Sequence, residues 1–250
     1  AKLSRTGHTT WSLDDVAFTN GPYLDVNTTA TTLTPSSAST GSRNITASAV
    51  TGINGGVGWL ATDVGREISM NSGKATITAR TSATIAVATV TTAFTNANAI
   101  TDWSLGAWSA TTGYPRTVSF FEQRLVFGGS TYYPQTIWAS QSGLYEDFDA
   151  GDGSAADGFI YTIAANKVNV IRWLAPARDL IVGTAGGEFK VGKPAGEPLQ
   201  PDNVQITQQT TYGGYTTQPI QIGNSILFLQ RQRKKIREFS YRFEDDAYTA

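Results

Sequence analysis

The hydrophobic residues of the chain fall in short runs separated by brief polar turns, a pattern that is typical of β-strands. Two apolar runs at 117–121 and 125–127 flank the polar residues 122–124, and a third run follows at 136–139. Strands joined by so few residues pair as antiparallel hairpins. Thr, Ser, Gly and Ala are abundant, whereas Leu and Glu, which favour helices, are sparse. We therefore predict an all-β chain.

One layout, an apolar strand followed by a polar turn and a second apolar strand, occurs three times, in 117–129, 168–191 and 219–241. The second strands read LVF from Leu125, LIV from Leu180 and ILF from Ile226. They recur at intervals of roughly 50 residues, the length of a four-stranded propeller blade. This spacing predicts a partial β-propeller, although a β-sandwich also gives regularly spaced hairpins. Since a propeller ring closes with about four or more blades, we expect the propeller to continue beyond this sequence.

The region from 27 to 100 has a different composition. It is rich in Thr, Ser, Ala and Gly, has few charges, and contains two large aromatic residues, Trp59 and Phe94. We predict that 27–100 is an inserted small β-barrel domain. It would lie between the first propeller strands, at 1–26, and the propeller blades at 101–250.

Within this insert, alternation over 75–79 and 85–90 predicts strands with small residues on the exposed face. The Thr/Ser-rich stretch 27–42 is consistent with an extended strand or ordered loop, or with a flexible linker.

Four stretches of the chain carry a family resemblance. They are LSRTGHTTWSLDDVAFTNGPYLD at 3–25, DVGREISMNSGKATIT at 63–78, the blade-like segment 103–149, and the segment 228–246. In this combination they resemble the tail nozzle proteins of short-tailed, podovirus-like bacteriophages, the tail tubular protein B or tail hub family. Together they cover about two fifths of the chain.

This resemblance implies a structural virion protein located in the tail, and no enzyme. The implied role is that of a subunit in the nozzle or hub ring, which forms the conduit for DNA ejection. The implied partners are copies of the chain itself in a ring of six, the tail adaptor (upper tail tube) protein, tail fibre or spike proteins, and viral DNA in transient passage. The resemblance implies no cofactor.

A second resemblance lies inside the insert. Trp59 and Leu60, the sequence Asp63–Arg66, the turn at Gly73 and the strand 75–78 resemble the module named after the first catalytic cysteine half-domain of ubiquitin-activating enzymes. In phage proteins the module is architectural. Since the chain has no cysteine and no nucleotide-binding loop, ubiquitin chemistry is excluded.

Composition narrows the classes of function. The formal net charge of −1 argues against a nucleic-acid binder that uses its whole surface, although it permits local basic patches. The absence of cysteine excludes disulfides, thiolate nucleophiles and cysteine-ligated zinc, and the single His8 cannot form a histidine cluster. No segment approaches the roughly 20 apolar residues that a membrane-spanning helix needs.

The run RQRKKIR at 231–237 is the strongest electrostatic feature. If it forms a strand, every second residue lies on one face, which gives a row of positive charges about 6–7 Å apart that suits phosphates. The simpler interpretation is a solvated hairpin or a charged edge strand, paired with the acidic residues 244–246. The candidates for lining a channel or a subunit interface are Arg231, Arg233, Lys234, Lys235 and Arg237.

Acidic residues offer weaker candidates. The Gly-rich loop 147–157 contains four aspartates whose carboxylate oxygens would suit calcium: Asp147, Asp149, Asp152 and Asp157. Their spacing lacks the glutamate of a helix-loop-helix calcium site, so a solvated turn is the simpler interpretation. Adjacent carboxylates at 14–15 and 146–147 face opposite sides of a strand, unlike a glycosidase pair. No Gly-x-Ser-x-Gly elbow accompanies His8. We predict no catalytic, cofactor-binding or metal-binding residue.

Aromatic residues are frequent between Trp103 and Tyr145. In blade-like strands such rings pack in cores more often than they stack on sugars or bases. Tyr132 and Tyr133 precede Pro134 in a predicted loop and are the candidates for contact with a protein partner. The alternatives to the nozzle role are a propeller that binds or hydrolyses carbohydrate on a host surface, and a cellular propeller scaffold.

Overall fold

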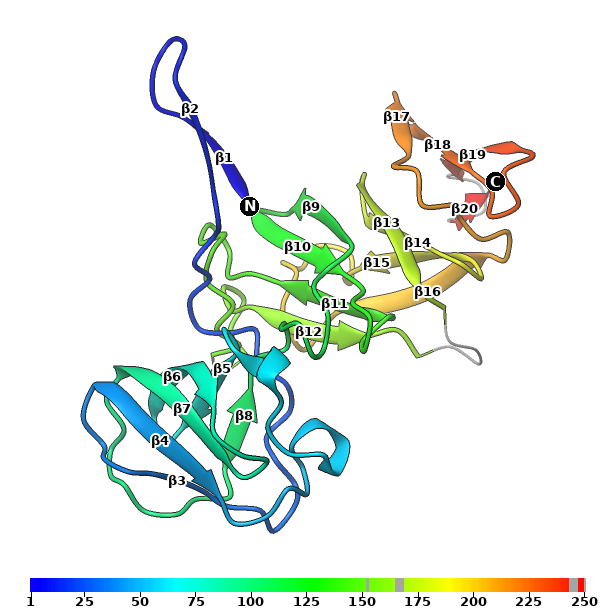
Figure 1. Cartoon of the computed structure of the whole chain (residues 1–250). Helices are drawn as coiled ribbons and strands as arrows, with labels where there is room; N and C mark the ends of the chain where they lie inside the picture. The colour runs from blue at the N-terminus through cyan, green and yellow to red at the C-terminus, as the bar shows by residue number, and fades with distance from the viewer. Residues whose placement is uncertain (152, 165–168, 243–246, 250) are drawn as a thin grey trace. The chain divides into compact units, whose positions relative to one another are not determined.

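The computed structural model describes residues 1–151, 153–164, 169–242 and 247–249. The chain is all-β, as its sequence predicts, with 45% of it in strands and 3% in helix (Figure 1). It divides into two compact units. Unit 1 comprises 1–20, 116–128 and 135–250, and unit 2 comprises 21–115 and 129–134.

Unit 1 contains three four-stranded antiparallel sheets, and in each the strands are adjacent in chain order. The first consists of β9 (Thr117–Phe121), β10 (Arg124–Gly128), β11 (Thr136–Ala139) and β12 (Phe159–Thr162). The second consists of β13 (Ile171–Pro176), β14 (Leu180–Thr184), β15 (Glu188–Gly192) and β16 (Gln205–Thr210). The third consists of β17 (Ile220–Ile222), β18 (Ser225–Leu229), β19 (Ile236–Arg242) and β20 (Ala247–Thr249).

The three predicted second strands, LVF, LIV and ILF, lie in β10, β14 and β18, so the predicted repeat of hairpins is confirmed. Each is an inner strand of its sheet. The residue Arg124, which the sequence assigned to a polar turn, is instead the first residue of β10 and only 1% exposed.

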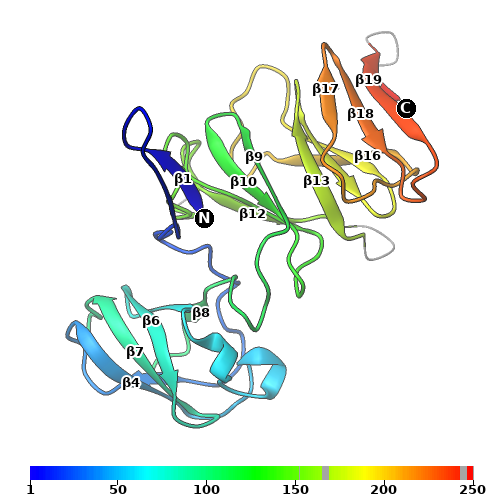
Figure 2. The same ribbon diagram turned by 45° about the horizontal axis from the view of Figure 1, so that its top comes forward.

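The sheets of unit 1 pack face to face, and Figure 2 presents them one after another. Val126 and Ile137 of the first sheet share a core with Val182 of the second. The opposite face of the second sheet contributes Trp173 to another core, which includes Phe228 of the third. Both faces of the second sheet are therefore buried, which explains why all five residues of β14 are buried.

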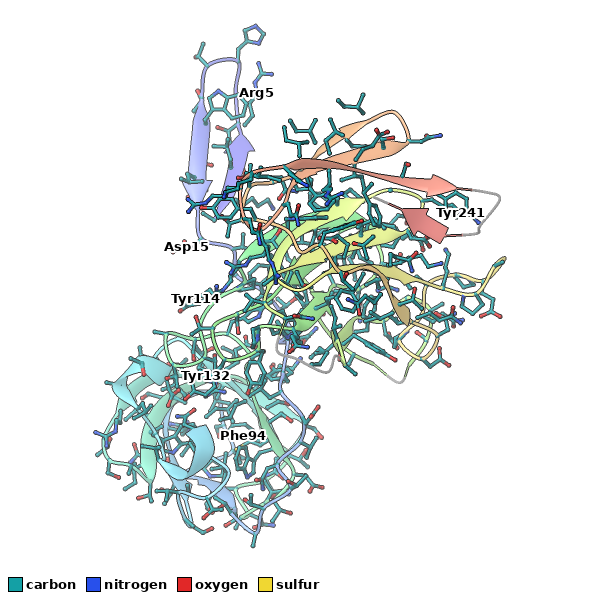
Figure 3. All side chains as sticks on the ribbon, turned by 90° about the vertical axis from the view of Figure 1, so that its right-hand side faces the viewer. Arg5, Asp15, Phe94, Tyr114, Tyr132 and Tyr241 are labelled. Carbon is teal, nitrogen blue, oxygen red and sulfur yellow. The ribbon has the colours of Figure 1, made fainter. Side chains whose placement is uncertain are left out.

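The N-terminal strands β1 (Lys2–Arg5) and β2 (Trp11–Asp14) form a two-stranded hairpin of their own. Among the described residues they join none of the four-stranded sheets, in contrast to the propeller strands expected there. Their register places Leu3 opposite Leu13 and Arg5 opposite Trp11. Figure 3 labels Arg5 in this hairpin.

Unit 2 is built on a six-stranded antiparallel sheet that curls into a half-barrel. Its strand order is β3 (Leu33–Pro35), β4 (Gly41–Ala47), β7 (Ile85–Thr92), β6 (Gly73–Arg80), β5 (Glu67–Met70) and β8 (Trp103–Leu105). Two short 3-10 helices, η1 (Asn54–Gly56) and η2 (Ala61–Asp63), connect β4 to β5. The stretch 27–42 contains β3 and the start of β4, so it is ordered.

Two details of unit 2 differ from the sequence-based expectation. Strand β8, expected at the start of the blade segment, pairs with β5 of the curled sheet. The predicted exposure of small residues is wrong for β7, because Ala86 and Ala88 are buried while Ile85 and Val87 are half-buried on the other face. Large rings such as Phe94, labelled in Figure 3, already fill much of the interior. Only small side chains therefore fit at the inward-facing positions of β7.

Candidate functional site

The basic segment 231–237 forms a turn rather than a strand. Strand β18 ends at Leu229 and β19 begins at Ile236, so most of the run lies in the connection between them. Arg233 has a φ of 60°, in the left-handed region used by tight turns. The predicted row of charges along one strand face is therefore wrong, since of the basic residues only Arg237 belongs to a strand. The acidic partners suggested at 244–246 lie outside the described residues.

Aromatic rings contact two arginines of the basic segment 231–237, one in the turn and one at the start of β19. The guanidinium carbon of Arg237 lies 3.8 Å from the ring centroid of Tyr212, and that of Arg233 lies 5.2 Å from the ring of Tyr215. Both are cation–π distances. Arg231 donates a hydrogen bond of 3.4 Å to a backbone carbonyl. In this segment, called the basic turn below, Arg233 and Arg237 therefore contact aromatic rings, and Lys234 and Lys235 are exposed.

The loop that carries Tyr212 also faces a buried carboxyl group, Glu188 of β15. The hydroxyl of Thr210 donates to its Oε2. Burial raises the pKa of Glu188, and the Thr210 hydroxyl, the N–H groups of Gly213 and Tyr212 and the charge of Arg237 act in the opposite direction. No sequence pattern indicated that Glu188 is buried, because a single glutamate in a strand is usually solvated.

Tyr132 and Tyr133 lie in a loop, as predicted, and this loop belongs to unit 2. The N–H of Tyr132 donates to the Thr112 carbonyl at 3.1 Å, and the N–H of Tyr133 donates to Ser130 Oγ at 3.1 Å. Tyr132 is 65% exposed, whereas Tyr133 is half-buried. Their contact with a protein partner stays a prediction.

Both tyrosines line a cavity of about 190 Å³ within unit 2. Residues from five separate stretches of the chain, together with Arg66, form its walls. The apolar lining residues are Leu24, Val57, Leu60, Trp103 and Leu105, and the polar ones include Asp25, Asn27, Asn54, Arg66, Thr111 and Thr112.

The sequence Asp63–Arg66, on which part of the resemblance rests, forms an ion pair beside this cavity. Asp63 Oδ1 lies 3.2 Å from Arg66 Nη1, and the two side chains are 0% and 1% exposed. Arg66 Nη1 also donates to Asn54 Oδ1 at 2.7 Å, and its Nε donates to the Gly106 carbonyl at 2.7 Å. Burial lowers the pKa of Arg66, and Asp63 opposes this effect. The arrangement joins η2 to the segment that follows β8.

Carboxylates of the loop 147–157 accept hydrogen bonds from other groups of unit 1. Asp147 accepts two hydrogen bonds from the side chain of Asn20, and Asp157 accepts the N–H groups of Gly153 and Ser154. Asp152 lies outside the described residues. Across the part of the chain that the structure describes, no three His, Asp or Glu side chains gather as metal ligands would.

The buried side chain of Arg124 donates hydrogen bonds to backbone carbonyls of this loop and of the strand end before it. Its guanidinium donates to the carbonyls of Ser140, Ala155 and Asp157 at 2.5–2.6 Å. Sequence reasoning missed this role because a basic residue beside Glu122 and Gln123 has the composition of an exposed turn.

The remaining candidates for chemistry are dispersed. His8 lies at the tip of the β1–β2 hairpin and contacts Arg5. Asp14 pairs in register with Lys2, whose ammonium group lies 2.5 Å from Glu146. Asp15 is exposed in the segment after β2 (Figure 3). These contacts form no nucleophile–base pair.

Comparison with known proteins gives no assignment: no protein-family model matches the chain, and no curated protein matches it. Among the described residues, no helix has the length and apolar character needed to span a membrane.

Proposed function

We propose that the chain is a structural subunit of the nozzle or hub ring in a short, podovirus-like phage tail, with no catalytic role. In this proposal the three four-stranded sheets of unit 1 are successive blades of a β-propeller. The curled sheet of unit 2 is an inserted architectural domain. The single observation that carries the proposal is the threefold repetition of one sheet topology along unit 1.

The order of the strands supports a propeller over a β-sandwich. A Greek-key sandwich exchanges strands between its two sheets, so that neighbours in a sheet are distant in sequence. Here every sheet of unit 1 is completed by consecutive strands before the next sheet begins, as in propeller blades. The buried faces between β10 and β14, and between β14 and β18, match the face-to-face packing of blades.

The outer faces of the end sheets support packing against further β-structure. On the third sheet, Ile220, Ile222 and Ile236 are 64%, 61% and 72% exposed. On the first sheet, Val118 and Phe120 are 51% and 61% exposed. Exposed aliphatic groups gathered on one sheet face are typical of an interaction surface. In a ring with rotational symmetry, two different faces of each subunit meet.

The basic turn fits this role as a subunit contact or as part of the channel wall. Two of its arginines, Arg233 and Arg237, contact the rings of Tyr215 and Tyr212, which favours a defined orientation of their charges. A channel that conducts DNA must not retain it, and each phosphate contact adds affinity that falls with salt. We therefore propose that the turn contacts a neighbouring subunit, while the ring joins the tail adaptor to fibres or spikes.

The test is cryo-electron microscopy of particles produced by the genome that encodes this chain. Density for unit 1 in a rotationally symmetric ring at the end of a short tail is the expected result. Absence of the chain from purified particles, or its presence only on separate fibres, would overturn the proposal.

A matched pair of variants tests the proposed contact face in the same particles. The double substitution Ile220→Ser, Ile222→Ser is expected to prevent incorporation of the subunit. Gln221→Ser, which lies between them on the alternate face of β17, is expected to leave incorporation unchanged. Equal incorporation of both variants would remove β17 from the assembly interface.

A further inference from the structure

The cavity of unit 2 contains an unused hydrogen-bond donor on a buried side chain. Arg66 is 1% exposed. Its Nε donates a hydrogen bond to the Gly106 carbonyl, and its Nη1 donates to Asn54 Oδ1 and Asp63 Oδ1. Among the described residues, its Nη2 has no hydrogen-bond partner, although Arg66 lines the cavity. This nitrogen is not among the buried polar atoms that lack a partner, so it is accessible and can donate a hydrogen bond to an acceptor that enters the cavity.

The charges around the cavity favour an uncharged acceptor. The positive charge of Arg66 is balanced by Asp63 at 3.2 Å. A second carboxylate, Asp25, lines the cavity, is exposed and makes no hydrogen bond or ion pair with the described residues. An anionic ligand would therefore meet a net negative surrounding, whereas a hydroxyl or amide oxygen accepts from Arg66 without that repulsion. Asp25 in turn accepts from hydroxyl donors.

The aromatic walls favour a ring with apolar C–H faces. The rings of Tyr132 and Tyr133 lie 6.5 Å apart and are tilted by 52°. Neither phenol hydroxyl makes a hydrogen bond with the described residues, and Trp103 also lines the cavity. Tyrosine supplies a flat apolar face and a polar end together, which suits a ligand that has both.

The volume of the cavity limits the ligand to about the size of a single sugar ring. Its volume of about 190 Å³ is below the roughly 300–1,000 Å³ of pockets that hold drug-sized molecules. We propose that the cavity binds a single neutral saccharide unit. One hydroxyl or acetamido oxygen accepts a hydrogen bond from Arg66 Nη2, other hydroxyls donate to Asp25, and the sugar ring packs on Tyr132. This proposal is independent of the nozzle role, because it concerns binding by the protein itself.

The experiment is saturation-transfer NMR on the whole chain. The probes are glucose, galactose, mannose, N-acetylglucosamine and N-acetylgalactosamine, with glucuronic acid as the anionic counterpart of glucose. At least one neutral sugar is expected to bind with a Kd on the order of 1 mM, a typical affinity for so small a ligand. Glucuronic acid is expected to bind more weakly than glucose. Absence of binding by all neutral sugars, or preferential binding of glucuronic acid, would overturn the proposal.

Two tyrosines of unit 2 provide a matched control. Tyr132 and Tyr114, both labelled in Figure 3, are 65% and 62% exposed. Of these two, only Tyr132 lines the cavity. Because both side chains are exposed, neither substitution should unfold the protein. Tyr132→Ala is expected to weaken sugar binding about tenfold or more, while Tyr114→Ala leaves it unchanged. Equal effects of the two variants would place binding elsewhere.

A third variant tests the role of charge. Asp25→Asn removes the exposed carboxylate of the cavity and is expected to reduce the preference for glucose over glucuronic acid. An unchanged preference would contradict the electrostatic part of the proposal. None of these measurements depends on whether the chain is found in a phage tail, so the two proposals fail separately.

Discussion

Asp63 and Arg66 form an ion pair that is almost completely excluded from solvent, with 3.2 Å between Asp63 Oδ1 and Arg66 Nη1. The carboxylate also accepts hydrogen bonds from Asn54 Nδ2, from the N–H of Leu60 and from Thr111 Oγ1. The DVGR sequence that contributes to the family resemblance therefore has a structural explanation. It fixes η2 and the connections around it.

Removal of this carboxylate should destabilise unit 2. Asp63→Asn leaves Arg66 buried without its countercharge, and loss of one partner of a buried ion pair typically costs about 3–5 kcal/mol. Urea unfolding followed by tryptophan fluorescence measures the effect, because Trp59 lies in the core of this unit. Asp102→Asn, at an exposed position of the same unit, is the control and should change the free energy of unfolding by less than about 0.5 kcal/mol. Equal effects would contradict a stabilising role for the ion pair.

A close contact between Gly183 and Trp173 predicts a second large effect. A Cβ atom added at Gly183 would lie 1.9 Å from Trp173 Cε2, in the core between the second and third sheets. Trp173 is fully buried and cannot move aside, so Gly183→Ala should destabilise unit 1 by about 3 kcal/mol or more.

Gly55→Ala separates this steric effect from backbone strain. Gly55 has a φ of 68° and no atom within 4 Å of an added Cβ, so its substitution tests strain alone and should cost about 1 kcal/mol. Thermal unfolding of both variants gives the comparison. If Gly183→Ala is the milder of the two, the packing of β14 against Trp173 is looser than described.

The sequence predicted the strands of unit 1 well because alternation and short turns are local signals. Leu125, Leu180 and Ile226 each begin an apolar triplet that lies in the second strand of a sheet. Local signals failed where tertiary contacts decide. Arg124 has the neighbours of a turn residue but is buried by carbonyl groups more than ten positions away along the chain. Arg233 adopts a left-handed conformation that reverses a run expected to be straight.

The cavity of unit 2 could not be predicted from the sequence for a related reason. Its lining combines Asp25, Arg66, Trp103 and Tyr132, which are far apart in the chain. The sequence places Tyr132 and Tyr133 in a loop as candidates for partner contact, but their position at one cavity with the buried Arg66 depends on the fold. The unpaired nitrogen of Arg66 is visible only when every hydrogen bond of that side chain is assigned.

The stacking of Arg237 on Tyr212 predicts a measurable coupling. At 3.8 Å from the ring centroid, the guanidinium should contribute about 0.5–2 kcal/mol through the cation–π interaction. A double-mutant cycle with Arg237→Ala and Tyr212→Leu measures this term by urea unfolding. Lys234→Ala, in the same turn but exposed, should be neutral. A coupling energy near zero would mean that the basic turn is not held by this ring.

Glu188 predicts a pH dependence of stability. Its pKa is raised from 4.5 by burial, so the folded state binds the proton more tightly than the unfolded state. The stabilisation from the protonated carboxyl is therefore fully present below about pH 4.5 and is lost as the pH rises through the folded-state pKa. Relative to Glu188→Gln, which cannot titrate, the wild-type protein should gain free energy of unfolding as the pH falls from 8 towards 5.

Urea unfolding of both proteins at several pH values within this range measures the difference. The matched control is Glu197→Gln, because Glu197 is an exposed glutamate in the loop that links β15 to β16. Its difference from the wild-type protein should not vary with pH. Since the Thr210 hydroxyl donates to Glu188, Thr210→Val should remove a bond that favours the charged form and should steepen the pH dependence. A wild-type protein that gains stability relative to Glu188→Gln as the pH rises would contradict the assignment, because it would mean that the folded state favours the ionised carboxylate.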